Sequence, residues 1–144
     1  MSDDFKKNLD LALGNAKRLS NKILIDGKLV SAKSSNIIKV VNPSTGEQIG
    51  EAPQCDKLDV DVAVSSAETA FHKWKKIPAR ERGKMMTAAA RKLEERRDEV
   101  ETLLALDTGN ALRTQAKPET AASIELTHMF AGLAGEIKGE NYPP

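Results

Sequence analysis

The most informative stretch of this 144-residue chain is Val40-Val41-Asn42-Pro43-Ser44-Thr45-Gly46-Glu47-Gln48-Ile49-Gly50. It predicts a β-hairpin, because the β-branched residues just before Asn42 suit a half-buried strand and residues 47–52 can return as its partner. Between the strands, Asn42 can accept a hydrogen bond from the turn backbone. Pro43 fixes φ at the first turn position, and Gly46 tolerates a positive φ.

Toward the N-terminus, the pattern predicts another hairpin and a helix. Asp26-Gly27 lies between two short apolar runs of residues 23–30, and this dipeptide favours a two-residue type I′ turn. Residues 3 to about 19 carry apolar side chains at helical spacing, with Ser2 as the expected N-cap. This helix either docks on a partner or packs on its own chain, and we favour the second interpretation.

Toward the C-terminus, Asp56 is expected to cap a helix with one apolar stripe: Val60, Val64, Ala67, Phe71 and Trp74. We interpret Trp74 as a core anchor rather than a ring that stacks on a cofactor. Pro78 suits the first turn of a second helix. The expected buried side of that helix comprises Met85, Met86, Ala89, Ala90 and Leu93.

Residues 91–101 mix charges at helical spacing and predict a solvated face. A helix restarting near Asp98 should bury Val100, Leu103 and Leu104 and stop at Thr108-Gly109. Pro118 starts or kinks the last helix. Its expected apolar face comprises Ala122, Leu126, Met129, Phe130, Leu133 and Ile137, and Gly132 and Gly135 are expected to permit close helix approach.

Composition excludes several classes of function. The formal net charge is +1 with both signs interspersed, so nothing favours nucleic acid or an anionic membrane as a partner. No apolar run approaches the length of a membrane span, and the N-terminus has no signal-peptide core. One cysteine cannot form an internal disulfide, and we therefore expect a reducing, cytoplasmic setting.

Four stretches in order resemble the N-terminal part of an aldehyde dehydrogenase. They are Leu24-Ile25-Asp26-Gly27-Lys28; Val41-Asn42-Pro43 with Thr45-Gly46-Glu47; Ala70-Phe71-His72-Lys73-Trp74 with Pro78-Ala79-Arg80-Glu81-Arg82; and Leu106-Asp107-Thr108-Gly109 with Ala131-Gly132-Leu133-Ala134-Gly135 and Gly139-Glu140. Together they cover about residues 22–144. Asn110-Ala111 departs from the Lys-Pro that many members carry there, which leaves the subfamily open.

The resemblance implies an α/β parent fold with a Rossmann-type nucleotide domain. In this chain it implies two β-hairpins (residues 23–52) followed by a layer of α-helices (residues 56–138). Residues 1–20 would form a helical extension, and residues 21–144 would form the N-terminal portion of the nucleotide-binding domain. We therefore expect a fragment that stops before the central sheet, and the remainder of the aldehyde dehydrogenase chain as its partner in a homo-oligomer.

The resemblance also implies the chemistry of the parent protein. Such an enzyme oxidises an aldehyde to a carboxylic acid with NAD or NADP, through thiolate attack, hydride transfer and thioester hydrolysis. Its nucleophile, general base and nucleotide loop match no position here, so we expect no catalytic or cofactor-binding residue and no bound nucleotide in this chain. Cys55 is the only thiol, but it does not match the family's nucleophile, which comes much later in the chain.

The resemblance implies one further site. Many members hold a monovalent cation, K⁺ or Na⁺, and the matching ligands here are the backbone carbonyls of Val40 and Val41 and the carboxylate of Asp107. Asp107 also makes sense as a helix-end residue without a metal. At least one further ligand would come from beyond residue 144, so we expect a complete site only in a longer protein.

The alternative to this enzyme hypothesis is a free-standing, non-catalytic helical module that binds another protein through its apolar stripes. The reading frame beyond Pro144 discriminates between the two hypotheses.

Overall fold

The computed structural model describes residues 3–136 and 138–139, and within them the chain forms five α-helices and two separate two-stranded antiparallel sheets. The elements in chain order are α1 (Asp3–Leu19), β1 (Ile23–Ile25), β2 (Lys28–Val30), β3 (Ile37–Val41), β4 (Gln48–Pro53), α2 (Lys57–Trp74), α3 (Ala79–Glu95), α4 (Arg97–Thr108), the π-helical turn η1 (Leu112–Ala116), α5 (Lys117–Leu133) and the 3₁₀ turn η2 (Ala134–Glu136). None of the helices described is long and apolar enough to cross a membrane.

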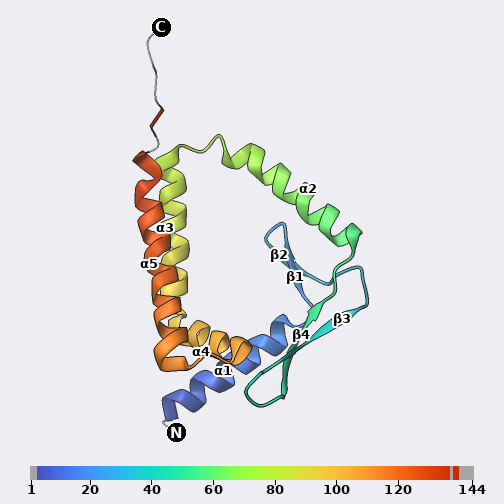
Figure 1. The fold of residues 1–144 in the computed structure, drawn as a ribbon. Coiled ribbons are helices and arrows are strands. Elements are labelled where there is room, and N and C mark those ends of the chain that lie inside the picture. Colours follow the sequence, from blue (N-terminus) through green and yellow to red (C-terminus); the bar gives the residue numbers. More distant parts are fainter. Residues whose placement is uncertain (1–2, 137, 140–144) are drawn as a thin grey trace.

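The elements form an open arrangement rather than stacked layers (Figure 1). Helices α3 and α5 lie side by side, and α1 packs across α4 and β4 at one end of that pair. Helix α2 runs along the opposite side and touches the rest of the described chain mainly at β1. The predicted order of two hairpins followed by helices is confirmed.

Both predicted hairpins are present. The turn between β1 and β2 has φ of 51° at Asp26 and 71° at Gly27, which are the two positive values that a type I′ turn requires. In the turn between β3 and β4, the Asn42 side-chain oxygen accepts a hydrogen bond from Ser44 N–H at 2.9 Å, and Gly46 has φ of 75°. The return strand spans Gln48–Pro53, one residue later than predicted.

The helix ends follow the predicted local chemistry. Asp56 and Asp59 form a reciprocal capping box at the start of α2. Pro78 occupies the N-cap of α3, and Pro118 lies in the first turn of α5. Gly109 ends α4 in the left-handed conformation.

The N-terminal helix buries the predicted face. Ala12 is fully buried, and Phe5, Leu9, Leu13 and Ala16 are half-buried. The interpretation that α1 packs on its own chain is therefore the one that the fold supports. The expected cap Ser2 lies outside the described residues.

Other predicted apolar faces are not buried in this chain. Trp74 is 39% exposed and Phe71 56%, so the prediction of Trp74 as a core anchor is wrong here. The predicted apolar face of α5 is exposed as well, with Phe130 at 55%. On α3, Met85 and Leu93 were predicted to be buried and are also exposed. Thr120, Ile124 and Ala131 form the buried side of α5 instead. Ile137 lies outside the described residues.

The physical reason for these corrections is that the described elements do not enclose those faces. The chain exposes 10575 Å², whereas a compact monomer of 144 residues exposes about 7200 Å². The sequence pattern identified amphipathic helices, but the described chain provides no second layer against their apolar stripes.

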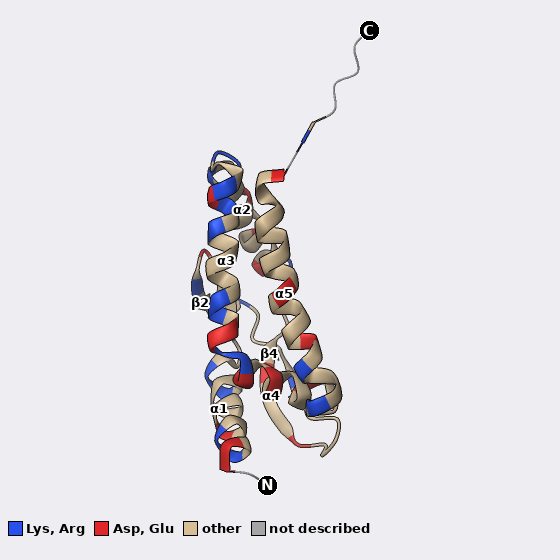
Figure 2. Cartoon of the chain, turned by 90° about the vertical axis from the view of Figure 1, so that its left-hand side faces the viewer, with Lys and Arg blue, Asp and Glu red and all other residues tan. Residues whose placement is uncertain are grey.

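Two further predictions need correction. Close approach of α3 and α5 occurs at Gly83, where an added Cβ would lie 2.5 Å from the Ala131 carbonyl oxygen, and not at Gly132, whose Cβ would meet nothing within 4 Å. The other predicted glycine, Gly135, does lie beside α3, because its added Cβ would be 3.6 Å from Arg80 Cγ. The charged stretch 91–101 is mostly exposed, but Glu99 is only 8% and Glu101 only 2% exposed. Figure 2 shows both signs of charge along α3 and a largely uncharged α5.

Candidate functional site

A cavity of about 380 Å³ lies where the end of α1, the hairpin β3–β4 and the end of α4 meet. Val40 and Asp107 both line it, so the fold brings together two of the three predicted ligand residues. Val41 follows Val40 on β3 but is not part of the cavity wall. The lining residues are Ala16, Leu19, Val40, Ile49, Gly50, Glu51, Val100, Leu103, Leu104 and Asp107.

The helix end places Asp107 beside the hairpin. Gly109 has φ of 73°, and its N–H donates to the Ala105 carbonyl. It caps α4, which ends at Thr108, one residue after Asp107. A Cβ at Gly109 would lie 2.7 Å from Pro43 Cγ, so α4 ends directly against the turn between β3 and β4. A residue with a side chain could not allow this approach without displacement.

A bulge distorts the hairpin at the two predicted carbonyls. Val40 pairs with Gly50 and Val41 pairs with Gln48, which leaves Ile49 as the extra residue on β4. A bulge locally disrupts the ladder of backbone hydrogen bonds and redirects the strand. The irregularity therefore falls at the backbone positions that the resemblance assigns to a cation.

The wall of the cavity is mostly aliphatic. Asp107 and Glu51 are its two acidic residues, and the lining includes no lysine, arginine or histidine. Glu51 accepts a hydrogen bond from the Gln48 amide at 3.1 Å. Hard cations prefer carboxylate and carbonyl oxygens. Because no group of three or more His, Cys, Asp or Glu side chains among the described residues could hold a metal ion, such a site must rely on backbone carbonyls.

Sequence analysis missed the contribution of α1 and of Glu51 to this cavity. Ala16 and Leu19 come from the segment before the resemblance begins, and Glu51 is an unremarkable strand residue in the sequence. No local pattern links these positions to Asp107. The only available signal was the apolar face of the first helix, which predicts burial but not a partner.

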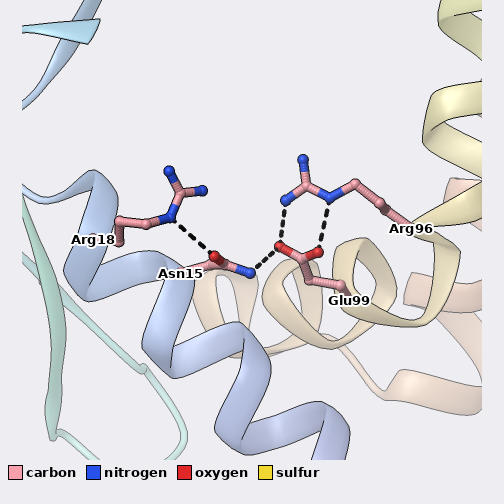
Figure 3. Close-up of polar contacts among 4 residues, drawn as sticks. All are labelled: Asn15, Arg18, Arg96 and Glu99. Carbon is pink, nitrogen blue, oxygen red and sulfur yellow. Dashed lines mark hydrogen bonds and ion pairs between the residues drawn. The ribbon is translucent and has the colours of Figure 1, made fainter.

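A hydrogen bond from Asn15 to the Glu99 carboxylate, which also pairs with half-exposed Arg96, joins α1 to α4. Arg96 donates to both oxygens of Glu99, from Nε at 2.9 Å and from a terminal nitrogen at 2.6 Å, and the Asn15 amide donates to the same carboxylate at 2.6 Å (Figure 3). Arg18 in turn donates to Asn15 at 3.2 Å. The hydrogen bonds from Arg96 lower the pKa of Glu99 below its ordinary value, although burial opposes this shift.

The remaining candidates do not form a site with these residues. Cys55 is exposed in the connection between β4 and α2. Asp59 is buried, but its carboxylate accepts hydrogen bonds from the backbone of Lys33, Ser34 and Asp56. These bonds, with that from Lys33 the largest influence, lower the pKa of Asp59. Asp59 thus fastens the loop after β2 to the start of α2.

Comparison with known proteins identifies the family. A sequence profile described as "Aldehyde dehydrogenase family" matches residues 29–144. The chain belongs to this family. It is 33% identical over 128 residues to the cytosolic 10-formyltetrahydrofolate dehydrogenase of Homo sapiens, a match that covers 88% of this chain and 14% of that protein.

Solved structures share the fold. HpcC from Thermus thermophilus superposes with a TM-score of 0.88 at 24% identity, covering 96% of this chain and 27% of that one. The betaine aldehyde dehydrogenase of Staphylococcus aureus in complex with NAD⁺ superposes with a TM-score of 0.84 at 31% identity, covering 92% of this chain and 27% of that one. The chain thus spans 14% of the length of the human relative and 27% of each of the two crystallised chains.

Proposed function

We propose that this chain is the N-terminal part of an NAD(P)-dependent aldehyde dehydrogenase and forms an outer helical layer of its nucleotide-binding domain. The observation that carries the proposal is the family match over residues 29–144. The complex of the staphylococcal relative with NAD⁺ supports a nicotinamide cofactor in the whole protein. When bound, that cofactor would accept a hydride from the aldehyde carbon.

The exposed apolar faces support a longer protein as the functional unit. Helix α2 presents Val60, Val64 and Phe71 to solvent, and α5 presents Leu126, Met129 and Phe130. Apolar surface of this extent is seldom left uncovered in soluble monomers. We propose that the rest of the aldehyde dehydrogenase chain covers these faces, and that the protein acts as a homo-oligomer in the cytoplasm.

We further propose that Val40, Val41 and Asp107 bind K⁺ or Na⁺ in that longer protein. The shared cavity, the two acidic residues among those that line it and the bulge at Val40 support this assignment. At least one more oxygen ligand must come from elsewhere, because one carboxylate and two carbonyls leave a hard cation incompletely coordinated. The affinity of the 144-residue chain alone for K⁺ or Na⁺ should therefore be poor.

One experiment tests the catalytic part of the proposal. NAD reduction is measured with several aldehydes, on the 144-residue chain and on the protein expressed from the whole of its reading frame. The short chain should show no turnover, and the longer protein should show it. Turnover by the short chain that a Cys55→Ser variant abolishes would contradict the proposal.

The second candidate function is a free-standing module that binds another protein. The same exposed faces on α2 and α5 favour it, since they could equally cover a separate partner. A reading frame that stops at Pro144, with no aldehyde dehydrogenase sequence beyond it, would support this alternative and exclude the first.

A further inference from the structure

We propose that Ser20, at the end of α1, is a positioning residue for the cation cavity and acts through β4 on the carbonyls of β3. The inference rests on the cation site proposed above. It assigns a role in that site to a segment that lies before the residues of the family match.

The end of α1 binds both backbone groups of Glu51. Ser20 Oγ accepts a hydrogen bond from Glu51 N–H at 3.1 Å and donates one to the Ala16 carbonyl at 3.0 Å. The Asn21 N–H donates to the Glu51 carbonyl at 3.0 Å. The main-chain groups of Glu51 are therefore directed toward α1 rather than toward β3.

This anchoring point lies next to the bulge. Gly50 adjoins Glu51 in sequence and pairs with Val40, while Ile49 is the residue left unpaired. The ladder of hydrogen bonds is locally disrupted at a bulge, and the bulged strand bends there. The hydrogen bonds from α1 hold Glu51 at the edge of β4 that faces away from β3. We infer that they fix the position at which β4 resumes its pairing with β3 after the bulge. The position of the Val40 carbonyl, opposite Gly50, depends on that pairing.

The same helix end also forms a wall of the cavity. Ala16 and Leu19 line it on the side contributed by α1, and Asp107 lines it from α4. The Asn15–Glu99 hydrogen bond fastens α1 to α4 one turn before Ser20. Docking of α1 and placement of the cation ligands are therefore coupled. Docking of α1 should then favour cation binding by the same free energy by which cation binding favours docking.

The first measurement uses the protein expressed from its whole reading frame and its variant Ser20→Ala. Ser123→Ala is the matched control, because Ser123 Oγ donates to the Glu119 carbonyl at 2.9 Å in the same i to i−4 geometry but contacts no strand. Ser20→Ala should accelerate amide hydrogen exchange at Glu51 and shift the carbonyl carbon resonances of Val40 and Val41. Ser123→Ala should leave these signals unchanged.

The second measurement separates positioning from simple stabilisation. The protein expressed from its whole reading frame is melted during a potassium titration, with tetramethylammonium holding the ionic strength constant. Ser20→Ala should raise the potassium midpoint about fivefold or more, as expected for coupled sites. Ser20→Thr, which keeps the hydroxyl, should restore it, and Ser123→Ala should leave it at the wild-type value.

The other outcomes count against the inference in distinct ways. If Ser20→Ala lowers the melting temperature equally in both salts with an unchanged potassium midpoint, the inference is overturned and the cation site stands. If the wild-type protein shows no potassium-specific effect, the cation site and the inference both fail. Should Ser20→Ala not fold, Ser20→Cys, a weaker hydrogen-bond acceptor of similar size, replaces it in both measurements.

Discussion

Gly109 shows how one residue connects a helix end to a hairpin. Its φ of 73° terminates α4, and the missing side chain allows contact with Pro43. An L-residue in this conformation costs about 1–2 kcal/mol, and a Cβ here would also overlap the proline ring.

We predict that Gly109→Ala destabilises the chain by more than Gly27→Ala. Gly27 has nearly the same φ, 71°, but a Cβ there would meet nothing within 4 Å, so it measures the backbone cost alone. Urea unfolding of both variants checks the difference. Equal losses of stability would show that α4 does not rest against the turn in solution.

The Glu99 carboxylate provides a second prediction at this scale. Because its pKa is lowered in the folded chain, it stabilises the fold above the ordinary value of 4.5 and loses this contribution as the pH falls through the lower folded value. We predict that Glu99→Gln costs about 1–2 kcal/mol at neutral pH, because its hydrogen bonds involve charged groups but Arg96 remains half-exposed.

The measurement for Glu99 is the free energy of unfolding against pH. The variant should approach the wild-type stability below pH 4.5. Glu95→Gln is the control, because Glu95 pairs with Lys92 on the surface and should change stability by less than about 0.5 kcal/mol. A wild-type pH dependence that Glu99→Gln leaves intact would show that another carboxylate causes it.

Among the elements, α3 and α5 form the closest helix contact, and Gly83 permits it. A side chain at this position would press on the backbone of Ala131, which cannot move aside as a flexible side chain could. We predict that Gly83→Ala destabilises the chain by about 1–3 kcal/mol, the usual cost of overpacking. Chemical denaturation provides the value.

Gly132 on α5 is the matched control for this contact. Its Cβ would lie in open space, so Gly132→Ala should stabilise the helix by up to about 1 kcal/mol through helix propensity alone. If Gly83→Ala is also neutral or stabilising, the two helices do not pack as described.

At the scale of the whole molecule, the main feature is a large exposed surface, to which many large apolar side chains contribute. The chain exposes 10575 Å², well above the roughly 7200 Å² of a compact monomer of its length. We predict that the isolated chain self-associates, binds a hydrophobic dye or remains partly molten. Light scattering and dye fluorescence are the measurements.

The opposite result would be informative about function. A monomer with a sharp cooperative melt and no dye binding would mean that the helices close a core by themselves. It would favour the free-standing module over a part of an aldehyde dehydrogenase. Replacing Phe71 and Phe130 with serine should reduce any self-association. Leu11→Ser should not, because Leu11 lies on the solvent-exposed side of α1, whose other side is already packed against the chain.

The sequence by itself determined the local structure of this protein. The Asp26-Gly27 turn, the Asn42 turn, the N-cap at Asp56 and the C-cap at Gly109 were all predicted and are all present. Each depends on the φ preference or hydrogen bonding of residues adjacent in the chain, so no distant contact is needed to specify it. The order of these signals also sufficed to identify the family.

Only the tertiary structure decided which faces are covered and which residues meet. Amphipathic spacing predicted burial of Trp74 and of the Met129 face and exposure of Glu99, and all three outcomes are reversed. Burial depends on what packs against a helix, and helical spacing does not contain that information. For the same reason, the sequence pattern alone did not show that Leu19, Val40 and Asp107, which are far apart along the chain, line one cavity.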